Sequence, residues 1–440
     1  MDLETFNWLL TGDGQTLLAE AMACDLSEAA RLRELTRLRQ RSTPDRAAAA
    51  YEIALLRRRA AAKFSCAASM YFTREALEQA SGETIATYRV ERYRPYGAVA
   101  DLACGIGGDA LALARVAQVT AVDRDPLRLA MAAANARACR VAERVTFVEA
   151  DLEQAPPPDA EAIFFDPARR RDGRRVFALK DYRPPVALVR RWRNSIPAIG
   201  VKVAPGVADE ELAALGELEV EFISVDGELK EAVLWVGPLG TPGRRATVLV
   251  TNEEPRTKNQ EPPRGYPTEN REQTSDGPRT TNNGQRTTDM QHATCFSILN
   301  SQFSIPPPLA PPAGYFYEPD PAIIRAHLVA ALAEQIGAAQ LDREIAYLTA
   351  DRAIDTPFAR CWRVIEWLPF GLKRLRARLR ALDAGAVTVK KRGSPLDTDA
   401  LARQLSGDGA RALVVVLTRL SDHPVALICE GPIQEPTNDE

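Results

Sequence analysis

The stretch Val99-Ala100-Asp101-Leu102-Ala103-Cys104-Gly105-Ile106-Gly107-Gly108-Asp109-Ala110 indicates how this 440-residue chain folds. A short, mostly apolar run is followed by a glycine-rich turn and then by apolar residues at helical spacing. Glycine lets the backbone turn sharply and approach a ligand, because no Cβ intervenes. The stretch therefore predicts a strand, a ligand-binding turn and a helix, in the order that α/β domains use.

Short β-rich runs continue to alternate with helical patterns after this stretch. Such alternation predicts βαβ units, in which parallel strands form a sheet with helices on both faces. The predicted strands are residues 99–102, 119–122, 145–148, 162–165, 199–203, 219–225 and 232–236.

Changes in composition divide the chain into four parts. Residues 1–94 show apolar side chains at helical spacing and predict a helical N-terminal domain, and residues 95–250 carry the predicted sheet. Residues 251–312 are rich in polar residues and proline, with few aliphatic residues, so we expect a low-complexity, disordered linker. Residues 313–432 predict a separate, small α/β domain, and the fold class of the whole chain is α/β.

The residue composition of the chain argues against several kinds of site and location. The seven cysteines include no C-x-x-C pair and the three histidines stand apart, which argues against a disulfide framework and a metal site. We therefore interpret each cysteine as a small buried apolar residue. No apolar run is long enough to span a membrane, and the start of the chain lacks the pattern of a signal peptide. These features predict a cytoplasmic protein without a metal or an obligate protein partner.

The acidic residues at the strand ends indicate which ligand the glycine turn binds. The pattern Gly105-x-Gly107-x-x-Ala110 also fits the dinucleotide fingerprint, so an NAD-binding oxidoreductase is one alternative. However, the carboxylate of Asp101 would repel a pyrophosphate, whereas it would attract the sulfonium and amino group of S-adenosylmethionine (SAM). Asp123 follows the second strand, where it can accept hydrogen bonds from ribose hydroxyls, and Asp151 follows the third strand, near the expected adenine. We therefore predict SAM as the cofactor.

Asp166-Pro167-Ala168-Arg169-Arg170 follows the fourth strand, at the sheet edge where ligands of open α/β folds bind. Methyl transfer requires a positioned nucleophile and a proton acceptor. We predict that Asp166 and Pro167 are catalytic, since the carboxylate accepts hydrogen bonds and the proline stiffens the turn. Arg169 and Arg170 are predicted to bind substrate phosphates, and Lys202 is predicted to line the same cleft as a further substrate-binding residue.

These motifs together resemble the class I SAM-dependent methyltransferases over roughly residues 95–240. The resemblance implies a Rossmann-like sheet in which Asp101, Gly105 and Gly107 hold the methionine end of SAM, Asp123 the ribose and Asp151 the adenine. The remaining residues of the predicted cofactor site are Ala103, Cys104, Arg124 and Leu152.

The sequence Asp166-Pro167-Ala168-Arg169 is also similar to the Asp/Asn-Pro-Pro-aromatic motif of enzymes that methylate exocyclic amines of bases. Here Ala168 replaces the second proline, and Arg169 replaces the aromatic residue that would stack on the base. A guanidinium plane can also stack on a base. A SAM-binding or RNA-binding module without catalysis is the alternative, if these two changes spoil the pocket.

The flanking parts resemble those of bacterial methyltransferases that carry a THUMP-like C-terminal domain. The similar stretches include 70–73 and Val389-Lys390-Lys391-Arg392-Gly393. THUMP modules bind RNA, so the resemblance implies an RNA substrate, with Lys390, Lys391 and Arg392 as further substrate-binding residues. The predicted function is SAM-dependent methylation of an RNA base, at an amino nitrogen.

Overall fold

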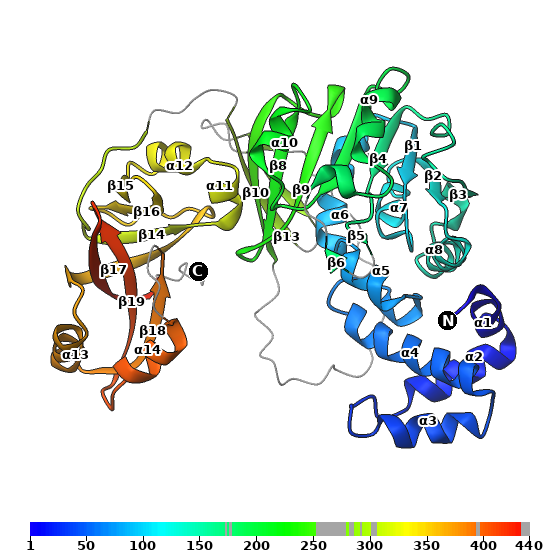
Figure 1. Cartoon of the computed structure of the whole chain (residues 1–440), viewed down its shortest axis with the longest axis horizontal. Helices are drawn as coiled ribbons and strands as arrows, with labels where there is room; N and C mark the ends of the chain where they lie inside the picture. The colour runs from blue at the N-terminus through cyan, green and yellow to red at the C-terminus, as the bar shows by residue number, and fades with distance from the viewer. Residues whose placement is uncertain are drawn as a thin grey trace. The chain divides into compact units, whose positions relative to one another are not determined.

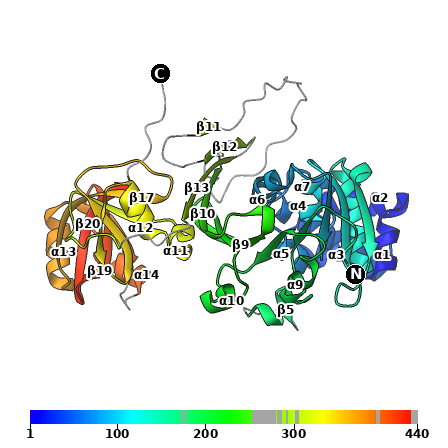
Figure 2. The same cartoon turned by 90° about the horizontal axis from the view of Figure 1, so that it is seen from above.

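The structure is a computed structural model, and its chain forms two compact units (Figures 1 and 2). It describes residues 1–171, 174–175, 178–251, 279–280, 286–290, 293–300, 306–392 and 397–432. The first unit comprises Met1–Val220, Glu231–Pro242 and Met290–Ala293, and the second comprises Glu221–Lys230, Gly243–Asp289 and Thr294–Glu440.

The N-terminal part is helical, as predicted (Figure 1). Threonine or aspartate side chains cap several of these helices by accepting a backbone N–H of the first turn, and Thr43 does so before Pro44, where a helix start is expected. The helices are α1 (Leu3–Leu9), α2 (Gly12–Met22), α3 (Arg31–Arg39), α4 (Pro44–Ala60), α5 (Arg74–Gln79) and α6 (Glu83–Val90), with short 3-10 turns at Ala67–Ser69 and Glu91–Tyr93.

These helices share a hydrophobic core with the sheet region. Phe6, Leu18 and Ile53 of the helical part belong to the same buried cluster as Ile106 and Met131, which lie beside the glycine turn and in the helix after the second strand. The predicted boundary between residues 94 and 95 therefore falls inside one compact unit. Apolar burial of this kind fixes the helices against the sheet region.

All seven predicted strands of the sheet are present. Those that belong wholly or partly to the first unit run in the order β8-β9-β7-β4-β1-β2-β3, with β1, β2, β3, β4 and β7 parallel. Their bounds are β1 (Ala98–Leu102), β2 (Gln118–Asp123), β3 (Val145–Glu149), β4 (Ala162–Phe165), β7 (Ala198–Val203), β8 (Glu219–Val225) and β9 (Glu228–Val236). The intervening helices are α7 (Gly108–Leu113), α8 (Pro126–Ala138), α9 (Val189–Trp192) and α10 (Asp209–Ala213), with short 3-10 turns at Ala142–Arg144, Leu179–Asp181, Val186–Leu188 and Gly237–Leu239.

Strand β9 departs from the expected parallel pattern, since it pairs antiparallel to β7. Only Asp226 and Gly227 separate β8 from β9, and both have positive φ values, 50° and 80°. An Asp-Gly pair in this conformation is typical of a two-residue hairpin, which reverses the chain direction. The remaining parallel strands place their carboxyl ends along one edge of the sheet.

The second unit contains a seven-stranded sheet in the order β15-β16-β14-β17-β20-β19-β18. Helices α13 and α14 pack on this sheet through a cluster that includes Leu375, Leu401 and Val415 (Figure 2). Strands β19 and β20 form an antiparallel pair near the end of the chain. The elements are β14 (Tyr315–Pro319), α11 (Pro321–Arg325), α12 (Val329–Gln335), β15 (Ala339–Asp342), β16 (Ile345–Ala350), β17 (Ala359–Pro369), α13 (Leu372–Ala381), β18 (Ala384–Lys391), α14 (Thr398–Leu405), β19 (Arg411–Leu420) and β20 (His423–Pro432).

Part of the predicted linker, 251–312, is structured. Strand β10 (Gly243–Thr251) ends at its start, and β11 (Arg279–Thr280), β12 (Arg286–Met290) and β13 (Ala293–Asn300) lie within it. In β13 the small side chains of Ala293, Cys295 and Ser297 are buried at alternate positions, a pattern that a count of aliphatic residues does not detect. The prediction of disorder for 252–278, 281–285, 291–292 and 301–305 lies outside the described residues.

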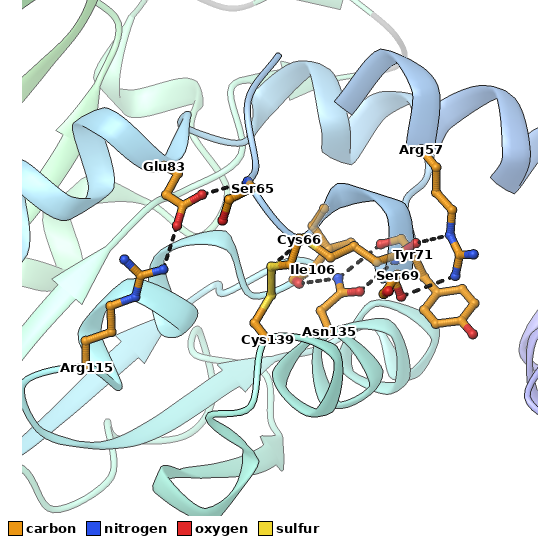
Figure 3. Close-up of a disulfide and its surroundings, with 11 residues drawn as sticks. Arg57, Ser65, Cys66, Ser69, Tyr71, Glu83, Ile106, Arg115, Asn135 and Cys139 are labelled. Carbon is orange, nitrogen blue, oxygen red and sulfur yellow. Dashed lines mark hydrogen bonds and ion pairs between the residues drawn. A yellow bond between two sulfur atoms is a disulfide. The ribbon is translucent and has the colours of Figure 1, made fainter. Parts of the chain in front are cut away.

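The prediction that each cysteine is a small buried apolar residue holds for Cys104, Cys295 and Cys429, whereas Cys24 and Cys361 are only half-buried. The prediction is wrong for the other two. Cys66 and Cys139 form a disulfide, which joins the segment before α5 to the end of α8 (Figure 3). The two residues are 73 positions apart, and only the packing of the helical part against α8 brings them together. No spacing motif in the sequence marks such a pair.

The side chain of Asn135 on α8 holds the same segment. Its amide nitrogen donates to the carbonyl oxygens of Tyr71 and Ile106, both at 3.0 Å, and its amide oxygen accepts the N–H of Tyr71 at 2.7 Å (Figure 3). Asn135 is fully buried, so each of these bonds compensates for lost hydration. The chain that enters α5 is therefore fixed to α8.

Among the described helices, none combines the length and apolarity needed to cross a lipid bilayer.

The disulfide is expected to stabilise the first unit. The double variant Cys66→Ala/Cys139→Ala should lower the free energy of unfolding by about 2–4 kcal/mol, because the cross-link restricts the unfolded chain. Urea unfolding of both proteins, with and without dithiothreitol, measures this. The reductant should destabilise the parent chain and leave the double variant unchanged, and an equal effect on both would contradict a stabilising role.

Candidate functional site

A cavity of about 360 Å³ lies at the carboxyl ends of β1, β2, β3 and β4, within the first unit. Most of the predicted cofactor and catalytic residues line it, together with residues of α5 and of the loop after β4. The lining residues are Glu75, Ala76, Gln79, Ala80, Ala103, Cys104, Gly105, Ile106, Gly108, Asp109, Asp123, Arg124, Asp125, Arg128, Ala150, Asp151, Leu152, Asp166, Pro167, Ala168, Arg169, Arg183 and Pro184.

The glycine turn forms the floor of this cavity. Ala103, Gly105 and Gly107 have φ values of 60°, 56° and 84°, in the left-handed region that favours glycine. A Cβ at Gly105 would meet no atom within 4 Å, so the residue leaves open space for a ligand. A Cβ at Gly107 would instead lie 3.1 Å from the Cβ of Ala132, and Gly107 does not line the cavity. Gly107 thus permits the close packing of α7 against α8.

The carboxylate of Asp123 is tied to the backbone on both sides. Its Oδ2 accepts the N–H of Gly105 at 2.8 Å, and its Oδ1 accepts the N–H of Asp125 at 3.0 Å. Carboxylate oxygens can accept more than one hydrogen bond each, so the side chain keeps capacity for the hydroxyls of a ribose. These bonds hold the carboxylate at the cavity wall, where it was predicted.

The loop after β3 supplies the next part of the wall. Asp151 and Leu152 both line the cavity, and the side chain of Asp151 accepts the N–H of Glu153 at 3.0 Å and an amide N–H of Gln154 at 3.1 Å. Leu152 is only 2% exposed, so it offers an apolar surface beside the acidic residue. This combination suits the edge and face of an adenine ring.

Asp101 does not lie where the sequence predicted it. It is fully buried and does not line the cavity, and neither carboxyl oxygen has a hydrogen-bond partner among the described residues. Burial, reinforced by the nearby carboxylates of Asp109 and Asp166, raises the pKa of Asp101 well above its usual range. A side chain at this position of an internal strand points into the protein, so Asp101 lies behind the cavity wall, where burial favours its protonated form.

Asp109 is the carboxylate that faces the cavity from this region. It lies in the first turn of α7 and forms an ion pair with the buried Arg89. Burial raises the pKa of Asp109, although the positive charges of Arg89 and Lys202 oppose that shift. A pyrophosphate bound at the N-terminus of α7 would meet this carboxylate, whereas a cationic ligand would be attracted to it.

Backbone hydrogen bonds hold the loop after β4 in place. The N–H of Asp166 donates to the carbonyl of Leu102 at 3.2 Å, and Ala168 exchanges two backbone hydrogen bonds with Arg183. Asp166, Pro167 and Arg169 line the cavity. The backbone of Arg170 belongs to the short strand β5 (Arg170–Arg171), which pairs with β6 (Arg174–Arg175), and the predicted role of its side chain lies outside the described structure.

Lys202 is not a surface residue of this cavity. It is 2% exposed, and its Nζ lies 2.6 Å from Oδ2 of Asp166 and 3.1 Å from the carbonyl oxygen of Gln79. The prediction that Lys202 lines the cleft and binds substrate is therefore wrong, because its side chain is buried behind the lining and its ammonium contacts two protein groups. Its contact is with the proposed catalytic carboxylate.

The three basic residues predicted near 390 belong to the second unit. Nζ of Lys390 is 2.6 Å from Glu318 and lies over the ring of Trp362, and the guanidinium of Arg392 lies over the ring of Tyr347. Lys391 is exposed. Lys390 and Arg392 are thus engaged by contacts within their own domain.

Sequence reasoning missed the contribution of α5. Met70, Tyr71 and Phe72 are buried, as expected for core residues, and the helix that follows them supplies Glu75, Ala76 and Gln79 to the cavity wall. Arg183 and Pro184 were missed as well. The sequence of the Asp-Pro-Ala-Arg loop does not indicate that the backbone of Ala168 pairs with that of Arg183.

The lining fits SAM. Open space lies above Gly105, the carboxylates of Asp109, Asp123, Asp151 and Asp166 surround the cavity, and an apolar surface lies at Leu152. Within the described part of the chain, no group of three or more His, Cys, Asp or Glu residues has the arrangement of a metal site.

The raised pKa of Asp101 predicts a pH-dependent effect of Asp101→Asn. As pH rises above the usual aspartate pKa, the unfolded chain releases this proton while the folded chain keeps it, so the wild type loses stability. The amide does not titrate, so the stability of Asp101→Asn relative to the wild type, measured by urea unfolding from acid to neutral pH, should improve as pH rises above about 4. The exposed variant Asp159→Asn should show no such trend, and a constant difference for Asp101→Asn would contradict a protonated Asp101.

Comparison with known proteins agrees with this geometry. Residues 99–166 match a methyltransferase domain, and residues 359–431 match the family described as THUMP domain-like. Residues 2–60 match a domain of unknown function, DUF8688. A protein of Porphyromonas gingivalis W83 that was provisionally assigned as a methyltransferase has a similar fold, with a TM-score of 0.66 at 20% identity, over 94% of this chain and 98% of its own.

Two relatives in Mycobacterium tuberculosis, from strains CDC 1551 / Oshkosh and ATCC 25618 / H37Rv, are uncharacterized SAM-dependent methyltransferases. Each is 35% identical over 404 residues, which cover 88% of this chain and 97% of the relative. The similarity to each relative therefore extends over most of the chain. The chain therefore belongs to the class I SAM-dependent methyltransferases that carry a THUMP-like C-terminal domain.

Proposed function

We propose that this enzyme methylates an exocyclic amino nitrogen of a base in RNA. The observation that carries the proposal is the position of Asp166 in the cavity wall, directly before Pro167. Its Oδ2 is held by Lys202, and Oδ1 has no partner among the described residues. A carboxylate held in this way presents one free acceptor to a ligand.

The residues around Asp166 support amine chemistry. An amino group that donates one N–H to Oδ1 would have its nitrogen lone pair oriented for attack on the methyl group, since the hydrogen bond fixes the rotation of the amino group. Bound SAM supplies an activated methyl group on a sulfonium. Formation of the new C–N bond would be matched by cleavage of the methyl–sulfur bond, with S-adenosylhomocysteine as the leaving group, and the nitrogen would lose a proton, which Asp166 is placed to accept.

We propose the following cofactor contacts: Asp109 and the turn at Gly105 toward the methionine end, Asp123 toward the ribose, and Asp151 with Leu152 toward the adenine. The positions of these residues in the cavity lining support this arrangement. Asp101 would act from behind the wall, as a neutral group beneath the turn.

Arginines at the cavity support a base or nucleotide as the acceptor. Arg169 and Arg183 line the wall on either side of the Ala168–Arg183 backbone pairing. A guanidinium can stack on a base or bind a phosphate bidentately, so either contact would replace the missing aromatic residue. Arg169 is therefore our proposed base-contacting or phosphate-contacting side chain.

The second unit offers a basic helix that favours RNA as the substrate. Helix α13 contains five Lys or Arg residues among ten and no acidic residue. Lys373, Arg374 and Arg380 are exposed and have no charged partner among the described residues, whereas Arg378 pairs with Glu366. Unpaired surface cations attract phosphates through release of counterions. We add these three residues to Lys391 as proposed RNA contacts.

A methyl-transfer assay tests the proposal. Purified protein, methyl-labelled SAM and total RNA from cells that lack this protein should give labelled RNA. Asp166→Asn should bind SAM with nearly unchanged affinity and transfer label about 100-fold more slowly, because the amide can accept an N–H but cannot take the proton. The exposed Asp159→Asn is the matched control. Binding of SAM by the wild type without label in any RNA would instead support the non-catalytic module.

The basic face of α13 generates a second prediction. Lys373→Gln/Arg374→Gln/Arg380→Gln should weaken RNA binding and reduce the slope of log affinity against log salt by about two. SAM affinity, measured by calorimetry, should not change. The control Arg39→Gln/Arg58→Gln/Arg59→Gln removes the same charge from exposed helical positions of the first unit. Equal losses of RNA affinity in both triple variants would contradict a specific role for α13.

A further inference from the structure

The buried Lys202 connects two walls of the cavity. It lies on β7, and its ammonium contacts Oδ2 of Asp166 at 2.6 Å and the carbonyl oxygen of Gln79 at 3.1 Å. Asp166 belongs to the loop after β4, and Gln79 is the last residue of α5. These two cavity-lining residues are 87 positions apart in the chain, and one side chain bonds to both.

The contact with Gln79 caps a short helix. The last carbonyl groups of any helix lack partners within the helix, and cations are favourable there. In α5 two lysines meet this need: Lys63 donates to the carbonyls of Leu77 and Ala80, at 2.7 and 3.1 Å, and Lys202 donates to that of Gln79. A helix of six residues has little stability of its own, so these external contacts decide its position.

The other end of the same segment is anchored separately. Asn135 binds both backbone groups of Tyr71, and Glu75 lies 3.6 Å from Arg128 on α8. The start of α5 therefore depends on α8, whereas its end depends on Lys63 and Lys202. Loss of Lys202 would release one end of this wall while the other end stays attached.

The contact with Asp166 orients the proposed catalytic carboxylate. A buried ammonium requires partners for its hydrogens, and Lys202 has two that the structure provides. Because Lys202 engages Oδ2 from behind, Oδ1 remains for the cavity side. Asp166 itself is 22% exposed at its side chain, so water can solvate it if the lysine is removed, and a variant at 202 need not leave a fully buried charge.

We propose that Lys202 is a positioning residue that orients Asp166 and fastens the end of α5, so that one ammonium holds both the carboxylate and the helical wall. The part that concerns Asp166 rests on the proposed function above. The part that concerns α5 does not depend on the substrate. Lys202 touches neither the cavity nor the reacting atoms, so its effects must pass through these two partners.

Hydrogen–deuterium exchange tests the structural part without RNA. Lys202→Met should increase exchange in peptides that cover residues 74–80 and 166–169, and should weaken SAM binding severalfold, because part of the cofactor wall loosens. The control Lys180→Met removes an exposed ammonium from the same unit and should change neither peptide. Unchanged exchange in 74–80 for Lys202→Met would overturn the inference. Circular dichroism checks folding, and Lys202→Gln, which keeps one donor, replaces the methionine variant if that variant does not fold.

A double-variant cycle tests the part that concerns Asp166. At saturating SAM, which removes the effect of weaker cofactor binding, Lys202→Met should lower kcat for RNA methylation about 100-fold with little change in the KM for RNA, because the orientation of the Asp166 carboxylate is lost. In the Asp166→Asn background, the same change should cost almost nothing further. Additive losses would refute a role through Asp166. If the wild type methylates no RNA, the proposed function fails, and the exchange experiment still decides whether Lys202 holds α5.

Discussion

The side chain of Arg89 lies buried beneath the cofactor cavity, where it forms ion pairs with Asp109 of α7 and Glu231 of β9 and stacks its guanidinium over the ring of Phe164 on β4. Ser81 donates to the other oxygen of Glu231 at 2.9 Å. Burial alone would lower the pKa of Arg89, and the two carboxylates more than offset this, so the group stays charged. Without this cation, several carboxylates would lie in a poorly hydrated region with little compensation, which is costly. The acidic lining that suits a sulfonium compound therefore depends on an arginine that the cofactor need not touch.

The helical N-terminal part is a structural component of the cofactor site. Arg89 comes from α6, and α5 forms one wall of the cavity. The shared core, the Cys66–Cys139 disulfide and the bonds of Asn135 hold these helices on the sheet region. Residues 2–60, which match a domain of unknown function, provide most of the helical side of that core. Their simplest role is to support the segment 66–80 that completes the cavity.

The charged residues are arranged differently in the two units, and each arrangement suits the role that we propose for that unit. In the first unit, the buried cations Arg89 and Lys202 form ion pairs with specific carboxylates, which is the arrangement expected where geometry must be precise. In the second unit, Lys373, Arg374 and Arg380 on α13 stay exposed and unpaired among the described residues, which suits diffuse attraction to a polyanion. The paired charges of the first unit suit the proposed catalysis, and the unpaired charges of α13 suit the proposed binding of RNA.

The sequence by itself determined the α/β order of the first unit, the glycine turn, the carboxylates of Asp123 and Asp151 at strand ends, and the Asp166-Pro167 loop. These features depend on residue periodicity and local turn chemistry, which short stretches of sequence contain. The family resemblance added the THUMP-like domain. Tertiary structure alone decided that Asp109 and not Asp101 faces the cavity, that Lys202 holds Asp166 and Gln79, that Cys66 meets Cys139, and that α5 forms a wall. Each of these facts is a contact between residues distant in the chain, or a choice between the two faces of a strand, and neither is recorded in local sequence.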